Sequence, residues 1–560
     1  MCGIAGKYDL KAEVSVNDLE KMSLALKHRG PDGEGFWINE TKNLGLAHRR
    51  LAVIDVGPEG NQPMHFQDRY VITYNGEIYN FIDIRNQLLA LGYVFRTSSD
   101  TEVILASFHH YGNKCLQYLD GMFAFVIYDK ETNNLFCARD RFGEKPFYYV
   151  HNQDHFLFAS EMKALWAIGV KKTISELGIY HYLVYDQFPS AVGFYEGIEE
   201  LTAGYFLEVT YSGHGLILKT TRYFDLEAMD DIETDKVDLK TLITDSIRSR
   251  SISDVGFCTS MSGGVDSAIV SAICKQEKHD LQSYGIGFPG QVDDETQKQN
   301  LLAKHLGINH SMLPTKGEDL WLLLTQLLHH QELPIASMSI CAQNRLYQFV
   351  RSDGHKVLLE GQGADEVFGG YNYHHKAHIE DLFKAHKIGA AITQSALHVW
   401  NNKSKLASKL GNITKGEIPL KPDFLMAHSS AQPSPKSNDF DNGSLQTLLR
   451  YSDRNSMMYG LEVRQPFLQE AVVKTGLSLP QTTKFKYGYK KYLLRKSFEA
   501  ILPGEILWQR EKIGFASPWP TLEMMQAVGS EGSKSDIYFD EINDLSLQWK
   551  FKKMMLDIIL

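Results

Sequence analysis

The second residue of the chain is a cysteine, and its position could make it chemically unusual. We expect Met1 to be removed, since the next side chain is small, which leaves Cys2 carrying both a thiol and an α-amine. The α-amine titrates near ~8 and a thiol near ~8.5, so the amine can take the thiol proton at neutral pH without a histidine. Cys2 is therefore a candidate nucleophile, although a cysteine at this position is also compatible with no chemical role.

A second candidate is the run Ser-Gly-Gly-Val-Asp-Ser at residues 262–267, between a strand-like and a helical segment. Backbone N–H groups at a helix start favour anions, and glycines let the backbone come close to oxygen atoms. The run lacks the Gly-Lys-Ser/Thr ending of the Walker motif, so cleavage between the β- and γ-phosphates of a nucleotide is not implied. Taken alone, the run is also typical of a tight turn.

The first part of the chain reads as short strands separated by turn signals, with helical patterns at 16–26 and 101–111. The strands are expected at 44–47, 70–74, 123–128, 135–138, 147–150 and 156–159. This pattern predicts an α+β domain with antiparallel sheet over residues 1–210. Glycines followed by an acidic run predict a linker over 211–235.

Strands alternate with helices after the predicted linker, and this alternation predicts a parallel, doubly wound sheet with ligands at the carboxyl ends of its strands. Strands are expected at 255–261, 282–288 and 356–360, and helices at 237–248, 266–275, 298–306 and 320–330. We assign residues 236–560 to this second domain, with a helical part from about residue 371. The stretch 427–444, rich in Ser, Pro, Asn and Asp, is expected to be a mobile loop.

The overall charge excludes some classes of function. Lys and Arg total 58 and Asp and Glu total 68, which gives a net charge of -10 and disfavours binding to nucleic acids. No apolar run approaches the ~18 residues that span a bilayer. The 6 cysteines include no pair spaced like a zinc half-site. We therefore expect a cytoplasmic protein with no membrane or nucleic-acid partner.

Several short motifs occur together in the first part of the chain. They are Cys2-Gly3-Ile4, His28-Arg29-Gly30-Pro31-Asp32, His48-Arg49-Arg50-Leu51, Asn75-Gly76-Glu77-Ile78-Tyr79-Asn80, Ser99-Asp100-Thr101-Glu102, Leu119-Asp120-Gly121-Met122-Phe123, Arg139-Asp140-Arg141-Phe142-Gly143 and Phe158-Ala159-Ser160-Glu161. In this order they resemble the glutamine amidotransferase domain of N-terminal-nucleophile type, which implies a four-layer αββα fold. The run at 262–267 is similar to the pyrophosphate loop of ATP pyrophosphatases. To about Pro518, the chain resembles the glutamine-hydrolysing asparagine synthetase family.

For the first domain, the resemblance implies that Cys2 attacks the side-chain amide of glutamine. Asn75 and the backbone N–H of Gly76 match the oxyanion hole of the family. The implied glutamine-binding residues are Arg50, Val53, Asn75, Gly76, Glu77 and Asp100. Arg50 would grip the α-carboxylate of glutamine, while Glu77 and Asp100 would accept from its α-ammonium group. The alternative for Arg50 and Asp100 is a structural ion pair.

For the second domain, the resemblance implies ATP as co-substrate and Mg²⁺ as cofactor. Asp266 and Asp365 match the metal carboxylates, since a hard cation needs oxygen ligands. The implied ATP-binding residues are Ser260, Ser262, Gly263, Gly264, Asp266, Ser267, Ile286, Glu360, Gly361 and Lys491. Of these, Ser260, Ile286, Glu360 and Gly361 would contact the adenine and ribose largely through their backbone. Taken alone, the basic cluster around Lys491 also fits a solvated helix face. Other matching motifs are Asp293-Asp294-Glu295, Asp453-Arg454-Asn455, Leu461-Glu462-Val463-Arg464 and Lys512-Ile513-Gly514-Phe515.

The implied reaction joins ammonia from glutamine to a carboxylate activated as its adenylate, with release of glutamate, AMP and pyrophosphate. Two positions depart from the family pattern. Gln362, which we still place among the catalytic residues, stands where a Glu is common and cannot act as a carboxylate base, and Gln469 stands where an Asp is common. The acceptor is therefore aspartate or another carboxylate, such as a sugar uronate or a peptide.

Two further expectations concern the class of the protein and its assembly. A non-catalytic scaffold or regulatory protein is the alternative of another class, and the complete set of Cys2, Asn75, Asp100, Asp266 and Asp365 argues against it. Large soluble enzymes of this kind are often dimers, so a homodimer is possible from the sequence.

Overall fold

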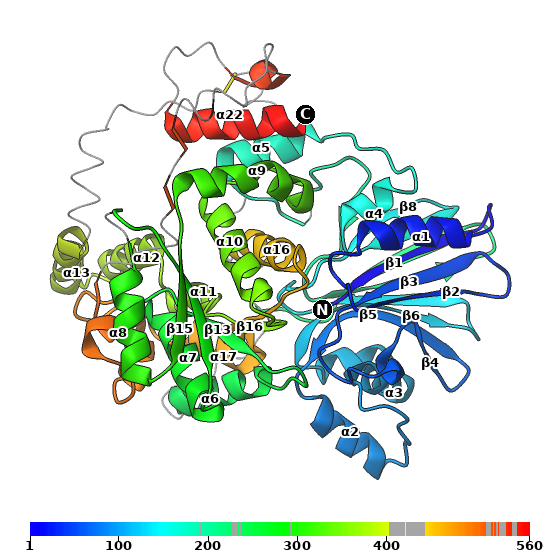
Figure 1. Ribbon diagram of the computed structural model, residues 1–560, viewed down its shortest axis with the longest axis horizontal. Helices are drawn as coiled ribbons and strands as arrows, with labels where there is room; N and C mark the ends of the chain where they lie inside the picture. The colour runs from blue at the N-terminus through cyan, green and yellow to red at the C-terminus, as the bar shows by residue number, and fades with distance from the viewer. Residues whose placement is uncertain are drawn as a thin grey trace.

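The computed structural model of the 560-residue chain has two parts, which lie side by side in Figure 1. It describes residues 1–190, 192–226, 228, 233, 237–291, 294–401, 420–421, 443–510, 517–518, 520–521, 525, 534–539 and 546–560. Residues 427–442 of the expected mobile loop, Asp293 and the motif at 512–515 lie outside these residues.

Two antiparallel sheets of six strands each form the first part, in the orders β10-β8-β9-β1-β3-β2 and β12-β11-β7-β6-β5-β4. Their strands are β1 (Gly3–Asp9), β2 (Gly33–Ile38), β3 (Leu44–Arg50), β4 (Met64–Phe66), β5 (Tyr70–Ile78), β6 (Gly121–Asp129), β7 (Asn134–Arg139), β8 (Tyr148–His151), β9 (His155–Ala159), β10 (Glu199–Glu200), β11 (Tyr205–Tyr211) and β12 (Leu216–Arg222). One buried cluster joins the facing sides of the two sheets. The sheets therefore stack face to face.

Helices cover the outer face of each sheet. Apolar side chains of α1 (Val16–Ala25) and α4 (Met162–Trp166) pack on the first sheet. Those of α2 (Phe81–Ala90) and α3 (Asp100–Tyr111) pack on the second sheet. The predicted four-layer αββα arrangement is confirmed.

Strand β6 shows why these layers form. Phe123 and Phe125 alternate along it with Ala124 and Val126, and all four side chains are buried. The phenylalanines belong to the cluster under α2 and α3, whereas Ala124 and Val126 belong to the cluster between the sheets. Alternate side chains of a strand point to opposite faces, so an apolar residue at every position suits a strand that is covered on both sides.

The prediction of a linker over 211–235 is wrong in its first part. Strand β12 pairs with β11 from Tyr211 opposite Leu216 to Tyr205 opposite Arg222, and so it extends the second sheet. Gly213 has a φ of 84°, which glycine adopts at little cost in a tight turn. The glycines that suggested a linker therefore belong to a hairpin turn.

The second part is built on a parallel sheet of five strands in the order β15-β14-β13-β16-β17, as predicted. Its strands are β13 (Cys258–Ser260), β14 (Gln282–Gly287), β15 (Asn309–Pro314), β16 (Val357–Leu359) and β17 (Glu462–Arg464). The helices of this part are α6 (Leu239–Arg250), α7 (Val265–Glu277), α8 (Thr296–Leu306), α9 (Gly317–Gln331), α10 (Ser339–Ser352), α11 (Ala364–Phe368), α12 (Asn372–Lys384), α13 (Ile388–Asn401), α16 (Ser444–Met457), α17 (Glu470–Ser478), α18 (Gln481–Lys484), α19 (Tyr492–Ser497), α20 (Gly504–Leu507) and α22 (Leu547–Ile559).

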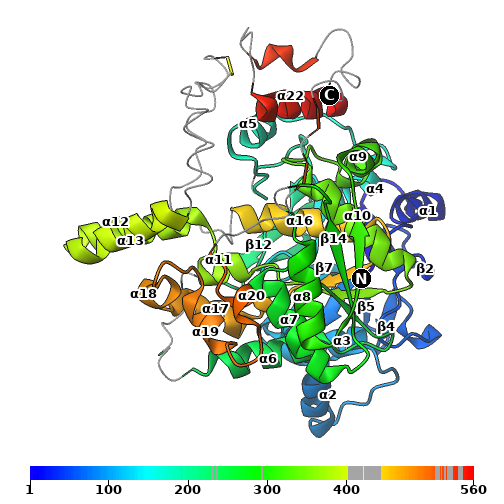
Figure 2. The same cartoon turned by 60° about the vertical axis from the view of Figure 1, so that its left-hand side comes forward.

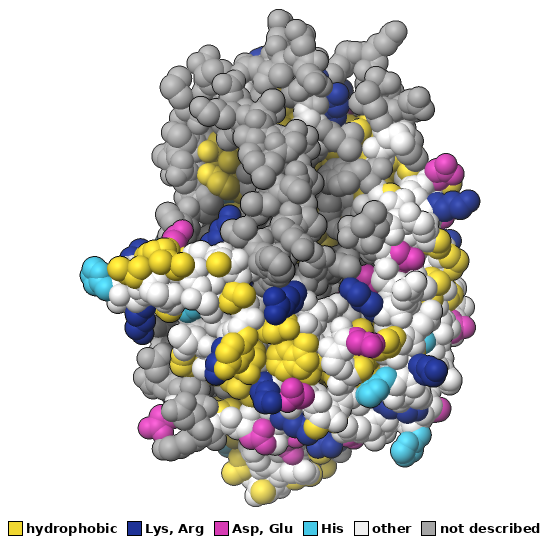
Figure 3. All heavy atoms as spheres, turned by 90° about the vertical axis from the view of Figure 1, so that its left-hand side faces the viewer, with side chains coloured by type: hydrophobic (Ala, Val, Ile, Leu, Met, Phe, Trp, Pro, Cys, Tyr) yellow, Lys and Arg dark blue, Asp and Glu magenta, His cyan; other side chains and the backbone are white. Residues whose placement is uncertain are grey.

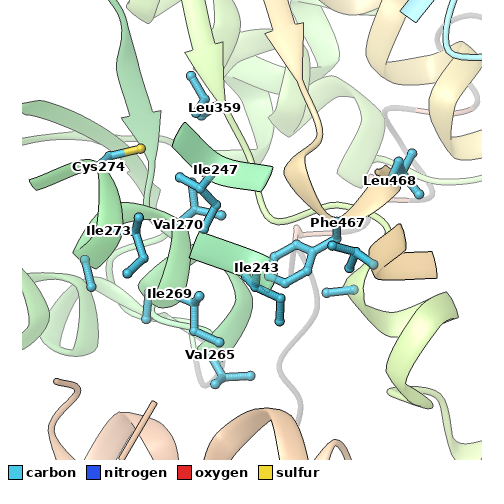
Figure 4. Packing of buried hydrophobic residues seen from close by; sticks show 14 of the residues in the cluster. Ile243, Ile247, Val265, Ile269, Val270, Ile273, Cys274, Leu359, Phe467 and Leu468 are labelled. Carbon is cyan, nitrogen blue, oxygen red and sulfur yellow. The ribbon is translucent and has the colours of Figure 1, made fainter. Parts of the chain in front are cut away.

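Helices lie on both faces of the parallel sheet. On one face, Ile243 and Ile247 of α6 pack against Ile269 and Ile273 of α7, as Figure 4 shows. On the other face, Tyr347 of α10 belongs to the buried cluster that includes residues of β13, β14, β16 and β17. Burial of each such large apolar side chain stabilises the fold by roughly 1.5–3 kcal/mol. This packing fixes where the strand ends lie.

Helices α12 and α13 project from the body of the second part (Figure 2). On the face that carries them, basic and acidic side chains lie interspersed among the described residues, and apolar side chains gather in patches (Figure 3). None of the described helices is long and apolar enough to cross a membrane.

The amino terminus of the chain lies at the boundary between the two parts (Figure 1).

Candidate active sites

Cys2 lies immediately before β1 and is buried where the two parts meet. Its backbone N–H donates to Oδ1 of Asn75 at 2.8 Å, and its carbonyl accepts from Nε of Arg29 at 3.0 Å. Burial raises the pKa of the Cys2 thiol, against the lowering effect of the nearby terminal ammonium group. A base must therefore take the thiol proton before the sulfur can attack.

The side-chain amide of Asn75, on β5, is engaged at its oxygen but not at its nitrogen among the described residues. Its Oδ1 is engaged by Cys2, while its buried Nδ2 finds no hydrogen-bond partner among the described residues. A buried amide donor left unpaired costs about 1–3 kcal/mol, so an oxygen bound there would relieve this cost. Beside it, a Cβ on Gly76 would lie 2.1 Å from the carbonyl oxygen of Met122. Only glycine allows β5 and β6 to approach so closely.

Two buried carboxylates, Glu77 and Asp100, lie near Asn75. Oδ2 of Asp100 accepts from the Tyr74 hydroxyl at 2.8 Å and from the Ile78 backbone N–H at 3.0 Å. Oε2 of Glu77 finds no partner among the residues that the structure describes. Burial raises the pKa of both groups, and for Glu77 the charges of Glu462 and Asp100 add to this effect. A bound ammonium group would favour the ionised form of both carboxylates.

Arg50 ends β3 and holds the loop that follows it. Its Nη1 donates to the Gly57 carbonyl at 2.6 Å and to Oδ1 of Asn61 at 2.9 Å, and its Nη2 donates to the Asp55 carbonyl. Within the described chain no ion pair joins Arg50 to Asp100, so the structural alternative left open by the sequence is not observed. Three loop acceptors therefore fix the position of the guanidinium.

The backbone of Val53, in the same loop, contacts the second part of the chain. Its carbonyl accepts from the Asp254 backbone N–H at 3.1 Å, and the Asp55 N–H donates to Oδ2 of Asp254 at 2.8 Å. The Val53 carbonyl, one of the backbone groups that the sequence placed in the glutamine site, is thus already hydrogen-bonded. The loop that Arg50 holds is therefore tied to both parts of the protein.

We expect Arg50→Lys to raise the KM for glutamine by about tenfold, the equivalent of ~1.4 kcal/mol. The planar guanidinium of arginine can donate several hydrogen bonds at once, to the loop carbonyls and to a carboxylate. The ammonium group of lysine is a point charge and cannot make this set of bonds. The measurement is glutamate release at varied glutamine concentration, with ammonia-dependent synthesis as the internal control. An unchanged KM would remove Arg50 from the glutamine site.

The second candidate site is a cavity of about 290 Å³ at the carboxyl ends of β13 and β16. Of the residues predicted for this half, those that line it are Ser260, Ser262, Gly264, Asp266, Ser267, Glu360, Gly361, Gln362, Asp365 and Lys491. Gly263 and Ile286 do not line it. The Gly263 carbonyl accepts from the Gln509 side chain, and the Ile286 carbonyl accepts from the Gln299 side chain.

The loop at 262–267 is held by its own serines. The Ser262 N–H donates to Oγ of Ser267 at 3.2 Å, and this Oγ in turn donates to the Gly264 carbonyl at 3.2 Å. Gly264 caps α7, so the first N–H groups of this 13-residue helix lie at the cavity wall. This arrangement suits the binding of phosphate oxygens.

Asp266 and Asp365 meet at one cationic group, the Lys491 ammonium. Its Nζ lies 2.6 Å from Oδ2 of Asp266 and 2.7 Å from Oδ1 of Asp365. Burial lowers the pKa of Lys491, but the two carboxylates outweigh it and raise this pKa overall. Lys491 is 4% exposed, so a solvated helix face does not describe it.

The two aspartates fit a magnesium ion because they already converge on one positive charge. No group of three or more His, Cys, Asp or Glu side chains that could hold a metal occurs in the described part of the chain. Mg²⁺ commonly takes one or two carboxylates and completes its shell with phosphate oxygens and water. Two carboxylates suffice for such an ion, so the residues present fit it without a larger set of protein ligands.

The structure shows several residues around the cavity that the sequence did not predict. Gln343 of α10, Tyr451 of α16 and Arg495 of α19 line it, and none of them belongs to a phosphate-binding loop. In contrast, Gln469 lies outside the cavity lining and donates to Oδ2 of Asp120 at 3.2 Å. This departure from the family pattern therefore lies at the boundary of the two parts.

Buried ion pairs connect the surroundings of Cys2 to the second part. Arg29, which contacts the Cys2 carbonyl, pairs with Glu161 and Asp453, each at 2.7 Å. The terminal ammonium group of Met1 lies 2.6 Å from Oε2 of Glu462 on β17. The sequence contained Arg29 and Glu462 in its motifs but gave no indication that they cross between the parts.

The double sheet with its buried cysteine and the parallel sheet with its phosphate-type loop together define an amidotransferase joined to a nucleotide-dependent synthetase. The family model "Glutamine amidotransferase domain" matches residues 1–224, and the model "Asparagine synthase" matches residues 238–535. The chain belongs to the family of glutamine-hydrolysing asparagine synthetases, which are carbon–nitrogen ligases.

Relatives match the chain over nearly its whole length. It is 31% identical over 591 residues to asparagine synthetase [glutamine-hydrolyzing] 1 of Bacillus subtilis (strain 168), covering 96% of this chain and 91% of that protein. It is 29% identical over 567 residues to asparagine synthetase B [glutamine-hydrolyzing] of Escherichia coli (strain K12), covering 95% of this chain and 85% of that protein.

Proposed function

We propose that this protein makes asparagine from aspartate, with ATP as the energy source and glutamine as the nitrogen donor. The observation that carries the proposal is the presence in one chain of both sites: the Cys2–Asn75 pair and the cavity with Asp266, Asp365 and Lys491. We assign glutamine hydrolysis to residues 1–210 and synthesis to residues 236–560. A cytoplasmic location and a homodimer belong to the same proposal.

In the first half, removal of Met1 would free the α-amine of Cys2 to take the thiol proton. The sulfur then attacks the glutamine amide carbon, and the unpaired Nδ2 of Asn75 and the Gly76 N–H donate to the oxygen that becomes negative. Ammonia leaves, and water hydrolyses the resulting thioester to glutamate. Arg50 would hold the α-carboxylate of glutamine, while Glu77 and Asp100 accept from its α-ammonium group.

In the second half, the aspartate side-chain carboxylate would attack the α-phosphate of ATP and release pyrophosphate. The N–H groups of the 262–267 loop would bind phosphate oxygens, and the Lys491 ammonium would balance their charge. Asp266 and Asp365 would hold Mg²⁺, which neutralises phosphate charge when bound. Ammonia from the first half would then displace AMP from the aspartyl adenylate.

The test is an acceptor assay with ATP, Mg²⁺ and glutamine. We expect aspartate to stimulate AMP and pyrophosphate release about tenfold or more over the same mixture without it, with asparagine as product. A larger carboxylate is the second candidate acceptor, because Gln362 replaces a carboxylate within the cavity. Stimulation by a uronate or a peptide, with none by millimolar aspartate, would establish that candidate. Release of ADP and phosphate would exclude both.

A further inference from the structure

The side-chain carboxylate of Glu360, in the synthetase cavity, has no role in the reaction described so far. Glu360 directly follows β16, two residues before Gln362, and both line the cavity. The amide of Gln362 can donate and accept hydrogen bonds but cannot take a proton at neutral pH. Yet when ammonia attacks an acyl adenylate, the nitrogen must lose a proton to form a neutral amide. A proton acceptor is therefore needed where ammonia attacks.

Hydroxyl groups rather than cations hold the Glu360 carboxylate. Its Oε2 accepts from the Tyr347 hydroxyl at 2.8 Å, and this hydroxyl lies 3.1 Å from Oγ of Ser452. The side chain also hydrogen-bonds to Ser260, at the end of the neighbouring strand β13. No ion pair neutralises Glu360 in the described parts of the chain. A carboxylate that served only to fix the structure would more commonly be paired with a cation at this depth.

Glu360 lies close to Asp266, the proposed metal ligand, through its neighbour Gly361. Gly361, the next residue, packs so closely on Asp266 that a Cβ there would lie 2.8 Å from the Asp266 backbone. On its other side, Tyr347 comes from α10, the helix that also contributes Gln343 to the cavity. Glu360 thus lies between the proposed metal carboxylate and the wall formed by α10.

The electrostatics of Glu360 suit a proton acceptor. The side chain is 6% exposed, and burial raises the pKa of its carboxyl to about 7, although the hydrogen bonds from Tyr347 and Ser260 act to lower it. A general base works best when its pKa is near the working pH. Glu360 can therefore exist in the basic form before the attack and in the protonated form after it.

We propose that Glu360 is a catalytic residue of the synthetase half and accepts a proton from the attacking ammonia, taking the place of the carboxylate missing at Gln362. The N–C bond forms at the acyl carbon, the C–O bond to AMP breaks, and AMP leaves with that electron pair. One nitrogen-bound proton passes to the Glu360 carboxylate. This inference rests on the proposed function.

The isosteric variant Glu360→Gln separates this step from adenylation. We expect aspartate-dependent exchange of pyrophosphate into ATP to stay within about threefold of the parent, while amide formation falls at least ~100-fold, the usual contribution of a general base. Moving the carboxylate back, in Glu360→Gln/Gln362→Glu, should restore a large part of amide formation. Full amide formation by Glu360→Gln would overturn the proposal, and so would equal loss of pyrophosphate exchange.

The pH profile provides a readout that a structural role would not change. The concentration of unprotonated ammonia is held constant while the pH is varied. The rate of amide formation by the parent protein should then rise through about pH 7 as Glu360 loses its proton, and the rate for Glu360→Gln should lack this rise. Tyr347→Phe removes a hydrogen bond that lowers the Glu360 pKa, so it should move the rise to higher pH. An unmoved rise would contradict the assignment. The other ionisable groups at the cavity are Asp266, Glu295, Asp365, Glu366, Tyr371, Tyr451, Lys490, Lys491, Arg495 and Arg510.

Failure of the proposed function would be visible separately, because it is read in the unaltered protein. If the parent shows no aspartate-dependent pyrophosphate exchange, aspartate is not the acceptor. If the parent exchanges pyrophosphate and Glu360→Gln behaves like it in every assay, only the inference about Glu360 is wrong.

Discussion

Replacement of Cys2 by alanine should abolish glutamine-dependent synthesis, by at least about 10³-fold, because the variant lacks the thiol of the residue that contacts Asn75. Synthesis from ammonium salts should stay near the parent rate, since the cavity that holds Asp266 and Lys491 is untouched. The measurements are glutamate release from glutamine and asparagine formation from each nitrogen source. Together they separate the two halves of the reaction.

A matched control for this variant is Cys115→Ala. Cys115 is fully buried in the cluster under α2 and α3 of the same half and should leave both activities near those of the parent. A folded Cys2→Ala protein that had also lost ammonia-dependent synthesis would show that the division of labour is wrong. Retained glutamate release would exclude Cys2 as the nucleophile.

The regular strands and helices could be predicted because local sequence determines them. The continuous apolar run of β6 indicated a strand, and the Ser15 hydroxyl, which accepts from the Asp18 N–H, marks the start of α1. Strand β1, with two glycines in seven residues, carries no such signal. It is a strand because β3 and β9 pair with it on both sides. Tertiary pairing here overrides a weak local preference.

Strand β17 shows a stronger limit of sequence reasoning. It contains the buried charges of Glu462 and Arg464, residues that are depleted in strand interiors. Nε of Arg464 lies 2.6 Å from Oε1 of Glu462, and the Met1 ammonium lies at the same distance from Oε2. These partners make burial of the charges tolerable. Arg464 lies two residues away on the same strand, but the Met1 ammonium comes from the far end of the sequence, so no local pattern could reveal this second partner.

The site residues also fall into two groups: those that a local motif reveals and those that only tertiary packing brings to the site. Residues of short motifs, such as Asp266 and Asp365, could be proposed because the motif itself positions the backbone at a strand end. Tyr347 comes from a helix without such a motif, and Ser452 precedes the Asp453-Arg454-Asn455 motif, which assigned it no role. The packing of α10 on α16 brings Ser452 to the Tyr347 hydroxyl, which donates to Glu360. The sequence suggested only a backbone contact for Glu360. The surroundings of its side chain become visible only when strand and helices are assembled.

We expect Asp266→Asn to reduce aspartate-dependent pyrophosphate exchange by at least about 100-fold, because an amide is a poor ligand for a hard cation. The change also removes one of the two charges that hold the Lys491 ammonium, leaving it paired with Asp365 alone. Asp365→Asn should give the same loss for the same reason. Basal glutamate release should be unchanged in both variants, since Cys2 and Asn75 contact neither aspartate.

A titration with Mg²⁺ distinguishes a lost metal ligand from a lost ion pair. If Asp266 binds the metal, the variant needs a higher Mg²⁺ concentration for half-maximal exchange, and added Mg²⁺ restores part of the rate. If Asp266 serves only to hold Lys491, Lys491→Met should lose pyrophosphate exchange to the same extent as Asp266→Asn. The Mg²⁺ concentration that Asp266→Asn needs for half-maximal exchange should then equal that of the parent. Normal pyrophosphate exchange by Asp266→Asn at ordinary Mg²⁺ would exclude both roles, because the loop would then bind the nucleotide without the carboxylate at its centre.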